Sequence, residues 1–289
     1  MKLAISKEEF IKGLQAVQNV VSTRTTLPIL ANVLLCAKGN LLILTSTDLD
    51  VTISKTVQAK VEKEGTFTIP VKKLHNIARE VEGNQVEMEV IGNLCSLESG
   101  SFSTKVNGLP AEEFPPIPEF KEQSTIRMEQ IKVKSMLRRT AYAVSIDENR
   151  YVLNGLFLSF REKKLTMVAT DGRRLALAEE EVEQSQESPI EVIVPTKAIQ
   201  ELSRQLEEEG DMDIKITENQ ASFSMGKEKE TVVVTKLVEG AYPNYKQVIP
   251  SESKYRVTMD KEELLHAVRR AEIMTSDKAN SVKMTFTEN

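Results

Sequence analysis

The chain has 289 residues, of which 40% are apolar and 28% are charged, and its formal net charge is −5 at pH 7. This composition is typical of a globular protein of about two domains and excludes disordered and membrane-spanning classes. The negative net charge argues against a protein whose whole surface is basic and binds nucleic acid. It still permits a basic stripe, because the local field rather than the total charge attracts phosphate.

The N-terminus and the cysteines indicate a cytoplasmic protein. The segment MKLAISKEEF is charged within its first ten residues and leaves no room for the apolar core of a signal peptide. No run approaches the ~18 uncharged apolar residues that a membrane span needs. Cys36 and Cys95 stand alone in apolar, strand-like runs without metal-ligand spacing, so we expect them to be reduced core residues.

The first predicted helix, SKEEFIKGLQAVQNVV, opens with a capping box formed by Ser6 and Glu9. Its pattern returns 123 and 254 positions later, and the last copy again opens with a capping box, Asp260 and Glu263. Each copy carries a stripe at the same four positions of one helix face: Phe10, Leu14, Val17 and Val21; Val133, Leu137, Thr140 and Val144; Leu264, Val268, Ala271 and Thr275.

Similar strand patterns follow the first two helices, LANVLLCAKGNLLILTSTDLDVTI at 30–53 and LNGLFLSFREKKLTMVATDGRRLAL at 153–177. Each predicts two strands joined by a polar turn, and each then reaches a Thr-Asp pair. Asp48 and Asp171 are 123 positions apart. The second half of the pattern also repeats, since 67–81 and 192–206 both predict a strand, a proline at the helix start, and a helix.

Segments that keep their order and spacing predict an internal duplication of α+β units, with helices over antiparallel sheet. Stretches that contain aromatic residues and prolines mark the boundaries between the units. These boundaries give a first repeat (1–120), a second repeat (121–252) and a third repeat (253–289). The third repeat stops at Asn289, at the tip of a predicted hairpin turn. Because fewer than ~40 residues rarely fold alone, we expect the chain to be a fragment of a three-unit protein.

Basic residues fall at matched places on the later helices of the first two repeats, Lys72 and Arg79 matching Lys197 and Arg204. Seven positions are nearly two turns, so each pair lies on one helix face, with the apolar residues opposite. One interpretation is a solvated helix face, and the other is a surface that binds nucleic-acid phosphates. Such binding would be sequence-blind and salt-dependent, and the chain lacks the aromatic residues of a stacking platform.

Signatures of catalysis and of cofactor or metal binding are missing. His75 and His266 lie on predicted helices without nearby ligands and are expected at the surface. No phosphate-binding loop, dinucleotide fingerprint or nucleophile elbow is present. The Asp-Gly pair in ATDGRRLAL predicts a turn, which leaves a hydrolase that uses Asp171 as the weaker alternative. A peptide-binding scaffold with incidental basic helices is a second alternative.

Four stretches, TLPILANVLL, RYVLNGL, VATDGRRLA and YPNYKQVIP, resemble the β subunit of bacterial DNA polymerase III, the sliding clamp family, in register along the whole chain. The resemblance implies tandem DNA-clamp domains of the processivity fold, with antiparallel sheets outside and two helices per domain lining the inner face. Two three-domain subunits would close head-to-tail as a homodimer around double-stranded DNA. The ring would tether the replicative polymerase without chemistry or a cofactor. We expect this chain, with its short third repeat, not to form the normal ring.

The resemblance also implies site residues. The DNA-binding positions would be Arg24, Lys72, Arg79, Arg150, Tyr151, Lys197 and Arg204. A hydrophobic pocket for short peptides of the polymerase, the clamp loader and repair proteins would include Leu153, Thr170, Gly172, Arg173, Arg174, Leu175, Pro243 and Val248. Gln247 stands at the pocket rim where many relatives have arginine, and Ile273 and Met274 match the ring interface.

Overall fold

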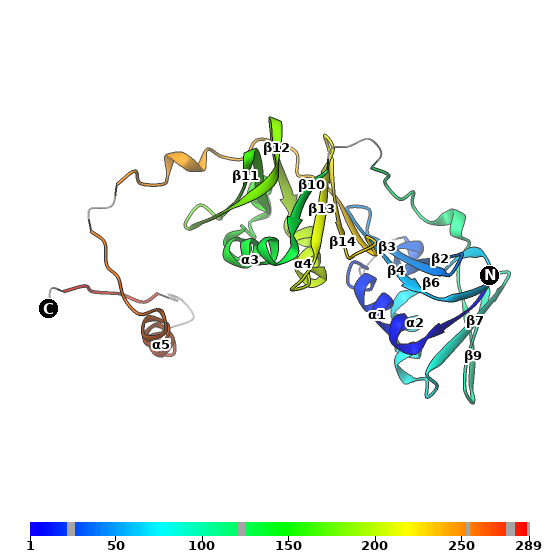
Figure 1. Ribbon diagram of the computed structural model, residues 1–289. Helices are drawn as coiled ribbons and strands as arrows, with labels where there is room; N and C mark the ends of the chain where they lie inside the picture. The colour runs from blue at the N-terminus through cyan, green and yellow to red at the C-terminus, as the bar shows by residue number, and fades with distance from the viewer. Residues whose placement is uncertain (22–26, 121–124, 253–254, 276–280, 288–289) are drawn as a thin grey trace. The chain divides into compact units, whose positions relative to one another are not determined.

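The computed structural model describes residues 1–21, 27–120, 125–252, 255–275 and 281–287, without the side chains of 183–188. The chain divides into two compact units, Met1–Tyr242 and Pro243–Asn289. The larger unit carries helices α1 (Lys7–Val17), α2 (Val71–Glu80), α3 (Gln130–Thr140) and α4 (Thr196–Gln205). Figure 1 shows α1 beside α2 and α3 beside α4, with all four helices on the same side of the sheets.

Two sheets of the larger unit have five and eight strands. The first runs β5-β1-β7-β8-β9. Its strands are β5 (Lys60–Lys63), β1 (Lys2–Ser6), β7 (Gln85–Ile91), β8 (Leu94–Ser99) and β9 (Phe102–Asn107). The second runs β10-β13-β14-β15-β4-β3-β2-β6. Its strands are β10 (Ile126–Glu129), β13 (Asp211–Ile216), β14 (Gln220–Met225), β15 (Thr231–Lys236), β4 (Val51–Gln58), β3 (Leu41–Thr47), β2 (Asn32–Lys38) and β6 (Gly65–Pro70).

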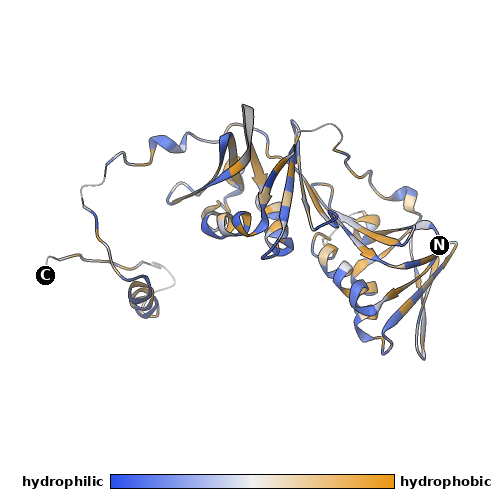
Figure 2. Cartoon of the chain, in the orientation of Figure 1, coloured by the Kyte–Doolittle hydropathy of each residue, from blue (hydrophilic) through white to orange (hydrophobic). Residues whose placement is uncertain are grey.

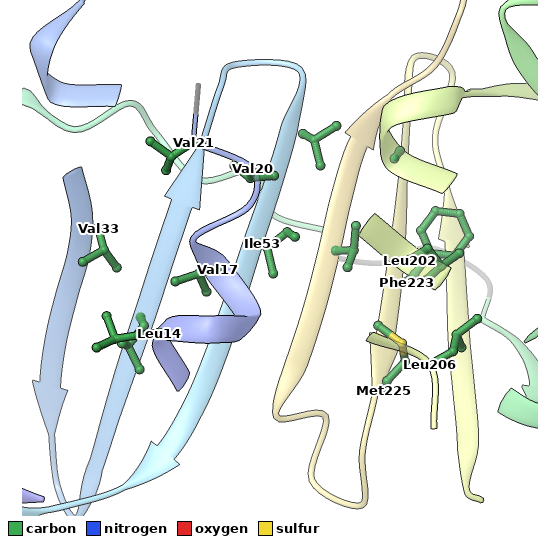
Figure 3. Packing of buried hydrophobic residues seen from close by; sticks show 14 of the residues in the cluster. Leu14, Val17, Val20, Val21, Val33, Ile53, Leu202, Leu206, Phe223 and Met225 are labelled. Carbon is green, nitrogen blue, oxygen red and sulfur yellow. The ribbon is translucent and has the colours of Figure 1, made fainter. Parts of the chain in front are cut away.

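The eight-stranded sheet crosses from the first repeat into the second. β15 pairs antiparallel with β4, from Thr231 opposite Lys55 to Thr235 opposite Val51. Backbone hydrogen bonds therefore join the two repeats, and a hydrophobic core continues across them. In Figure 3, Val17 and Val20 lie beside Ile53 of β4, in the first repeat, and Leu202 and Phe223 lie on the side of the second repeat.

The helices form where the sequence predicts them, and their apolar stripes are buried. Ser6 Oγ accepts a hydrogen bond from the Glu9 backbone N–H at 3.2 Å, which confirms the predicted capping box. The helices are shorter than predicted, because α1 ends at Val17 and α3 at Thr140, so Val21 and Val144 lie beyond them. Every stripe residue of these two copies is nevertheless buried: Phe10, Leu14, Val17, Val21, Val133, Leu137, Thr140 and Val144. Figure 2 shows these helices with apolar colour toward the sheets and hydrophilic colour on the other face.

The strand pattern of the second repeat differs from the prediction in one respect. The structure has a single strand, β11 (Gly155–Thr170), where two strands and a turn were expected. The strand is irregular at the position of the predicted turn, because Glu162 has a φ of 57° and the register of the strand pairing shifts on either side of this residue. Residues 155–160 pair with one end of β12 (Leu175–Pro195) and residues 164–170 with the other, as β2 pairs with β6 and β3 with β4.

The smaller unit contains helix α5 (Lys261–Glu272), and Asp260 caps it by accepting from the Glu263 N–H at 2.9 Å. None of the α5 residues is buried within the described chain. Ile273 and Met274, the predicted ring-interface residues, follow α5 with 79% and 86% exposure. Among the described helices of either unit, none is long and apolar enough to cross a membrane.

The predictions for the cysteines and histidines hold only in part, since Cys95 is buried as expected but Cys36 is half-buried. Cys36 and Cys95 are both free, and burial raises the pKa of the Cys95 thiol to about 12. His75 was expected at the surface but is buried, because Val71 four residues before it and Ala78 three residues after it lie on the core face of α2. His266 is exposed, as predicted.

Candidate functional site

The two Thr-Asp pairs form the same turn. Asp48 N–H donates to the Val51 carbonyl oxygen at 3.2 Å, and Asp171 N–H donates to the Arg174 carbonyl oxygen at 3.4 Å. The threonine hydroxyl accepts from the N–H two residues ahead at 3.1 Å in both turns. The repeated Thr-Asp pair of the sequence therefore forms the same turn in both repeats of the structure. Asp171 accepts hydrogen bonds within its own turn.

Asp171 is fully engaged within its own turn. Its Oδ1 accepts from the backbone N–H groups of Arg173 and Arg174 at 2.9 and 3.0 Å, and its Oδ2 accepts from Arg174 Nε at 3.1 Å. The backbone hydrogen bond from Arg173 is the largest cause that lowers the pKa of this carboxyl group. A carboxylate held in this way organises the loop, which agrees with the prediction of a turn rather than a catalytic aspartate.

The turn is braced against the segment before β11. Arg174 Nη2 donates to the Tyr142 carbonyl oxygen at 2.7 Å, and its guanidinium lies 5.5 Å from the centroid of the Tyr142 ring. Arg150, in the short helix η4 (Glu148–Leu153), donates from Nη1 to the Asp171 carbonyl oxygen at 3.2 Å. Arg150 also pairs with Asp147 at 3.1 Å.

Six of the eight predicted pocket residues therefore belong to neighbouring segments of the larger unit. Thr170 and Leu175 are half-buried at the two ends of the turn, Gly172 and Arg173 are exposed at its tip, and Leu153 is buried in η4. Pro243 and Val248 belong to the smaller unit, where both are exposed. Tyr142 joins the first group through its contacts with Arg174. It was not among the predicted residues, because no local sequence pattern indicates that its carbonyl group and ring contact an arginine of a distant turn.

The predicted DNA-binding residues have different environments. Lys72 and Arg79 are exposed on α2, on the face opposite the buried Leu74. Arg204 is exposed on α4 and pairs with Glu201, which is 2% exposed. Lys197 is half-buried and pairs with Asp48. Tyr151 is 60% exposed beside Arg150, and Arg24 lies outside the described residues.

The three repeats match three known protein domains in the same order along the chain. Residues 1–118, 127–244 and 246–289 match the N-terminal, central and C-terminal domains of the DNA polymerase III beta subunit. The chain belongs to the β sliding clamp family. It is thus a non-catalytic accessory subunit of a DNA polymerase, a processivity clamp, and the resemblance noted in the sequence is confirmed.

Individual sliding clamps match nearly the whole chain. The beta sliding clamp of Chlamydia trachomatis serovar D is 32% identical over 99% of this chain and 68% of its own length, and that of Pseudomonas putida is 34% identical over 98% and 77%. The crystal structure of the Bacillus subtilis clamp superposes with a TM-score of 0.91 at 29% identity over 96% and 75% of the two chains. The Pseudomonas aeruginosa clamp bound to griselimycin gives 0.91 at 32% identity over 97% and 76%. The sliding-clamp fold with antiparallel sheets and helices is thereby confirmed.

Proposed function

We propose that this sliding clamp holds double-stranded DNA through the exposed faces of its helices and carries polymerase through the turn at Thr170–Leu175. The division into clamp domains 1–120, 121–252 and 253–289 belongs to the proposal, as do a homodimeric ring for the complete assembly and a cytoplasmic location. The clamp loader and repair proteins would share the peptide site.

The observation that carries the DNA-binding part is the matched chemistry of α2 and α4. Each helix buries one face, with Leu74 and Leu202 at 0% and 2% exposure, and leaves its arginine, Arg79 or Arg204, exposed on the other. Arginine and lysine contact phosphates without reading bases, so these helices would bind duplex DNA of any sequence. The proposed set is Arg24, Lys72, Arg79, Arg150, Tyr151, Lys197 and Arg204.

A peptide site at the turn is supported by its rigidity. Arg174 is fixed on three sides, by Asp171, the Tyr142 carbonyl and the Tyr142 ring, and Arg150 braces the tip. Because these side chains are already ordered, a short peptide would bind without a large entropic cost. The proposed pocket comprises Leu153, Thr170, Gly172, Arg173, Arg174, Leu175, Pro243 and Val248, with Ile273 and Met274 at the ring interface.

Encirclement predicts retention that depends on the topology of the DNA. After loading by a clamp loader, the closed homodimeric ring of the complete assembly should remain on a nicked circular plasmid in ~0.2 M salt and leave once the plasmid is linearised, because electrostatic contacts alone are weak at that salt. Equal retention on circular and open-ended linear DNA would overturn the encircling mechanism.

The scaffold alternative has its own test. If the basic helix faces are incidental, replacing Lys72, Arg79, Lys197 and Arg204 with glutamate leaves loading on circular DNA unchanged. We expect loading to be lost in this variant, while binding of a polymerase peptide, measured by fluorescence anisotropy, is retained. Griselimycin, which is bound to the P. aeruginosa clamp, is a suitable competitor in the peptide assay.

A further inference from the structure

Helix α1 of the first repeat ends at Val17 without a basic residue in its last turn. The carbonyl groups at the end of a helix lack partners within the helix and carry the negative end of its dipole. Two side chains of α4, from the second repeat, meet this end and the segment that follows it. Gln205 Nε2 donates to the Ala16 carbonyl oxygen at 2.9 Å, and Lys197 Nζ donates to the Val20 carbonyl oxygen at 3.2 Å.

Lys197 has a second partner in the first repeat. Its ammonium group pairs with Asp48 Oδ2, while Asp48 Oδ1 accepts from the backbone N–H groups of Asp50 and Val51 at 3.1 and 2.7 Å. The turn thus holds the Asp48 carboxylate in place, and the side chain is only 16% exposed. The lysine is therefore bound between two acceptors of the first repeat.

The contacts of α4 with Ala16 and Val20 add to the strand pairing that joins the repeats, and the contact with Asp48 lies in the turn next to that pairing. β15 and β4 form one line of hydrogen bonds, extended by Lys236 N–H donating to the Asp50 carbonyl oxygen at 2.9 Å. A single line of strand pairing lets two sheets twist about it, since neighbouring strands tolerate a range of twist angles. The contacts of α4 with the end of α1, with the segment after it and with the Asp48 turn limit this freedom.

We propose that Gln205, which caps α1, and Lys197, which binds Asp48 and the segment after α1, are positioning residues that fix the angle between the first and second repeats. Lys72, the equivalent lysine of α2, is exposed, and the described chain offers it no carboxylate ion pair. Lys197 thus has partners at the joint that the matched Lys72 lacks. This inference uses contacts within one chain, so a failure of the encirclement experiment would leave it untouched.

A double-mutant cycle on the full chain tests the proposal. Lys197→Met and Asp48→Asn should each lower the midpoint of thermal unfolding by about 2–4 °C, the shift expected for a loss of about 1 kcal/mol in a unit of this size. The double variant should fall no further than the worse single variant, because the two residues share one contact. The asparagine side chain of the second variant would keep an oxygen for the backbone N–H groups, so the turn itself should survive.

Two further variants separate positioning from simple stability. Lys197→Arg should restore the midpoint, because a guanidinium can still pair with Asp48, whereas Lys72→Met, a change at the matched lysine without such a pair, should leave the midpoint unchanged. The proposal is overturned if Lys197→Met does not move the midpoint or if Lys72→Met lowers it equally. Additive effects of Lys197→Met and Asp48→Asn would overturn it equally.

Discussion

Leu49 and Gly172 occupy the same position in the two matched turns and adopt the same left-handed conformation, with φ of 80° and 83°. Such a conformation costs an L-residue about 1–2 kcal/mol, and glycine avoids this cost. The first repeat therefore tolerates strain at the joint with its neighbour, whereas the second repeat avoids strain at the proposed peptide site.

Substitutions at these two positions should differ in their effects. Gly172→Ala should destabilise the protein by about 1–2 kcal/mol, because alanine incurs the left-handed cost. Leu49→Gly should cause no loss, because relief of strain offsets the entropy that glycine adds to the unfolded chain. Urea unfolding followed by circular dichroism measures both. Equal losses in the two variants would show that φ does not control stability at these positions.

Neutralising the exposed α2 residues should weaken DNA binding without changing the fold. Lys72→Gln and Arg79→Gln each remove one proposed phosphate contact, which lowers the slope of log affinity against log salt by about 0.9 per contact on duplex DNA. Fluorescence anisotropy with a labelled duplex at several salt concentrations gives the slope. Lys105→Gln, an exposed change on β9 of the five-stranded sheet, is the matched control and should leave the slope unaltered.

His75 should make the protein less stable in acid. Burial, followed by the nearby positive charge of Arg79, lowers the pKa of His75 below its ordinary value of 6.5. The unfolded chain therefore binds more protons, so stability is complete above about pH 6.5 and is lost as the pH falls below it. The free energy of unfolding, measured by urea titration between pH 8 and pH 5, should show this decline.

Removing the imidazole tests this assignment. His75→Gln should flatten the pH dependence below pH 6.5, the ordinary pKa of the group, while His266→Gln, a change at the exposed histidine, should retain it. If the decline persists unchanged in His75→Gln, another group is responsible for it.

Tyr142 should contribute to peptide binding through Arg174. Tyr142→Ala removes a cation–π contact of about 0.5–1 kcal/mol and leaves the guanidinium held only by Asp171 and the backbone carbonyl, so peptide affinity should fall about two- to fivefold. Tyr142→Phe keeps the ring and the backbone carbonyl and should bind as the parent does. Isothermal titration calorimetry with a polymerase-derived peptide measures both. Loss of affinity in the phenylalanine variant would assign the effect to the hydroxyl group instead.

The sequence alone revealed the modular fold. Helix stripes such as Phe10, Leu14 and Val17, the capping box at Ser6 and the matched Thr-Asp turns are local patterns with fixed periods, and local patterns are encoded by neighbouring residues. The resemblance of four short stretches was enough to identify the clamp family. Six of the residues predicted for the pocket lie on neighbouring segments, because five of them are nearly consecutive in the sequence.

Only the tertiary structure decided what the individual side chains contact. Lys72 and Lys197 occupy matched positions, yet one is exposed and the other pairs with Asp48 of a different repeat. His75 is buried by the packing of α2 against the core, and Tyr142 meets Arg174 across 32 positions of sequence. Such contacts depend on which surfaces of distant segments come together, and periodicity carries no information about that.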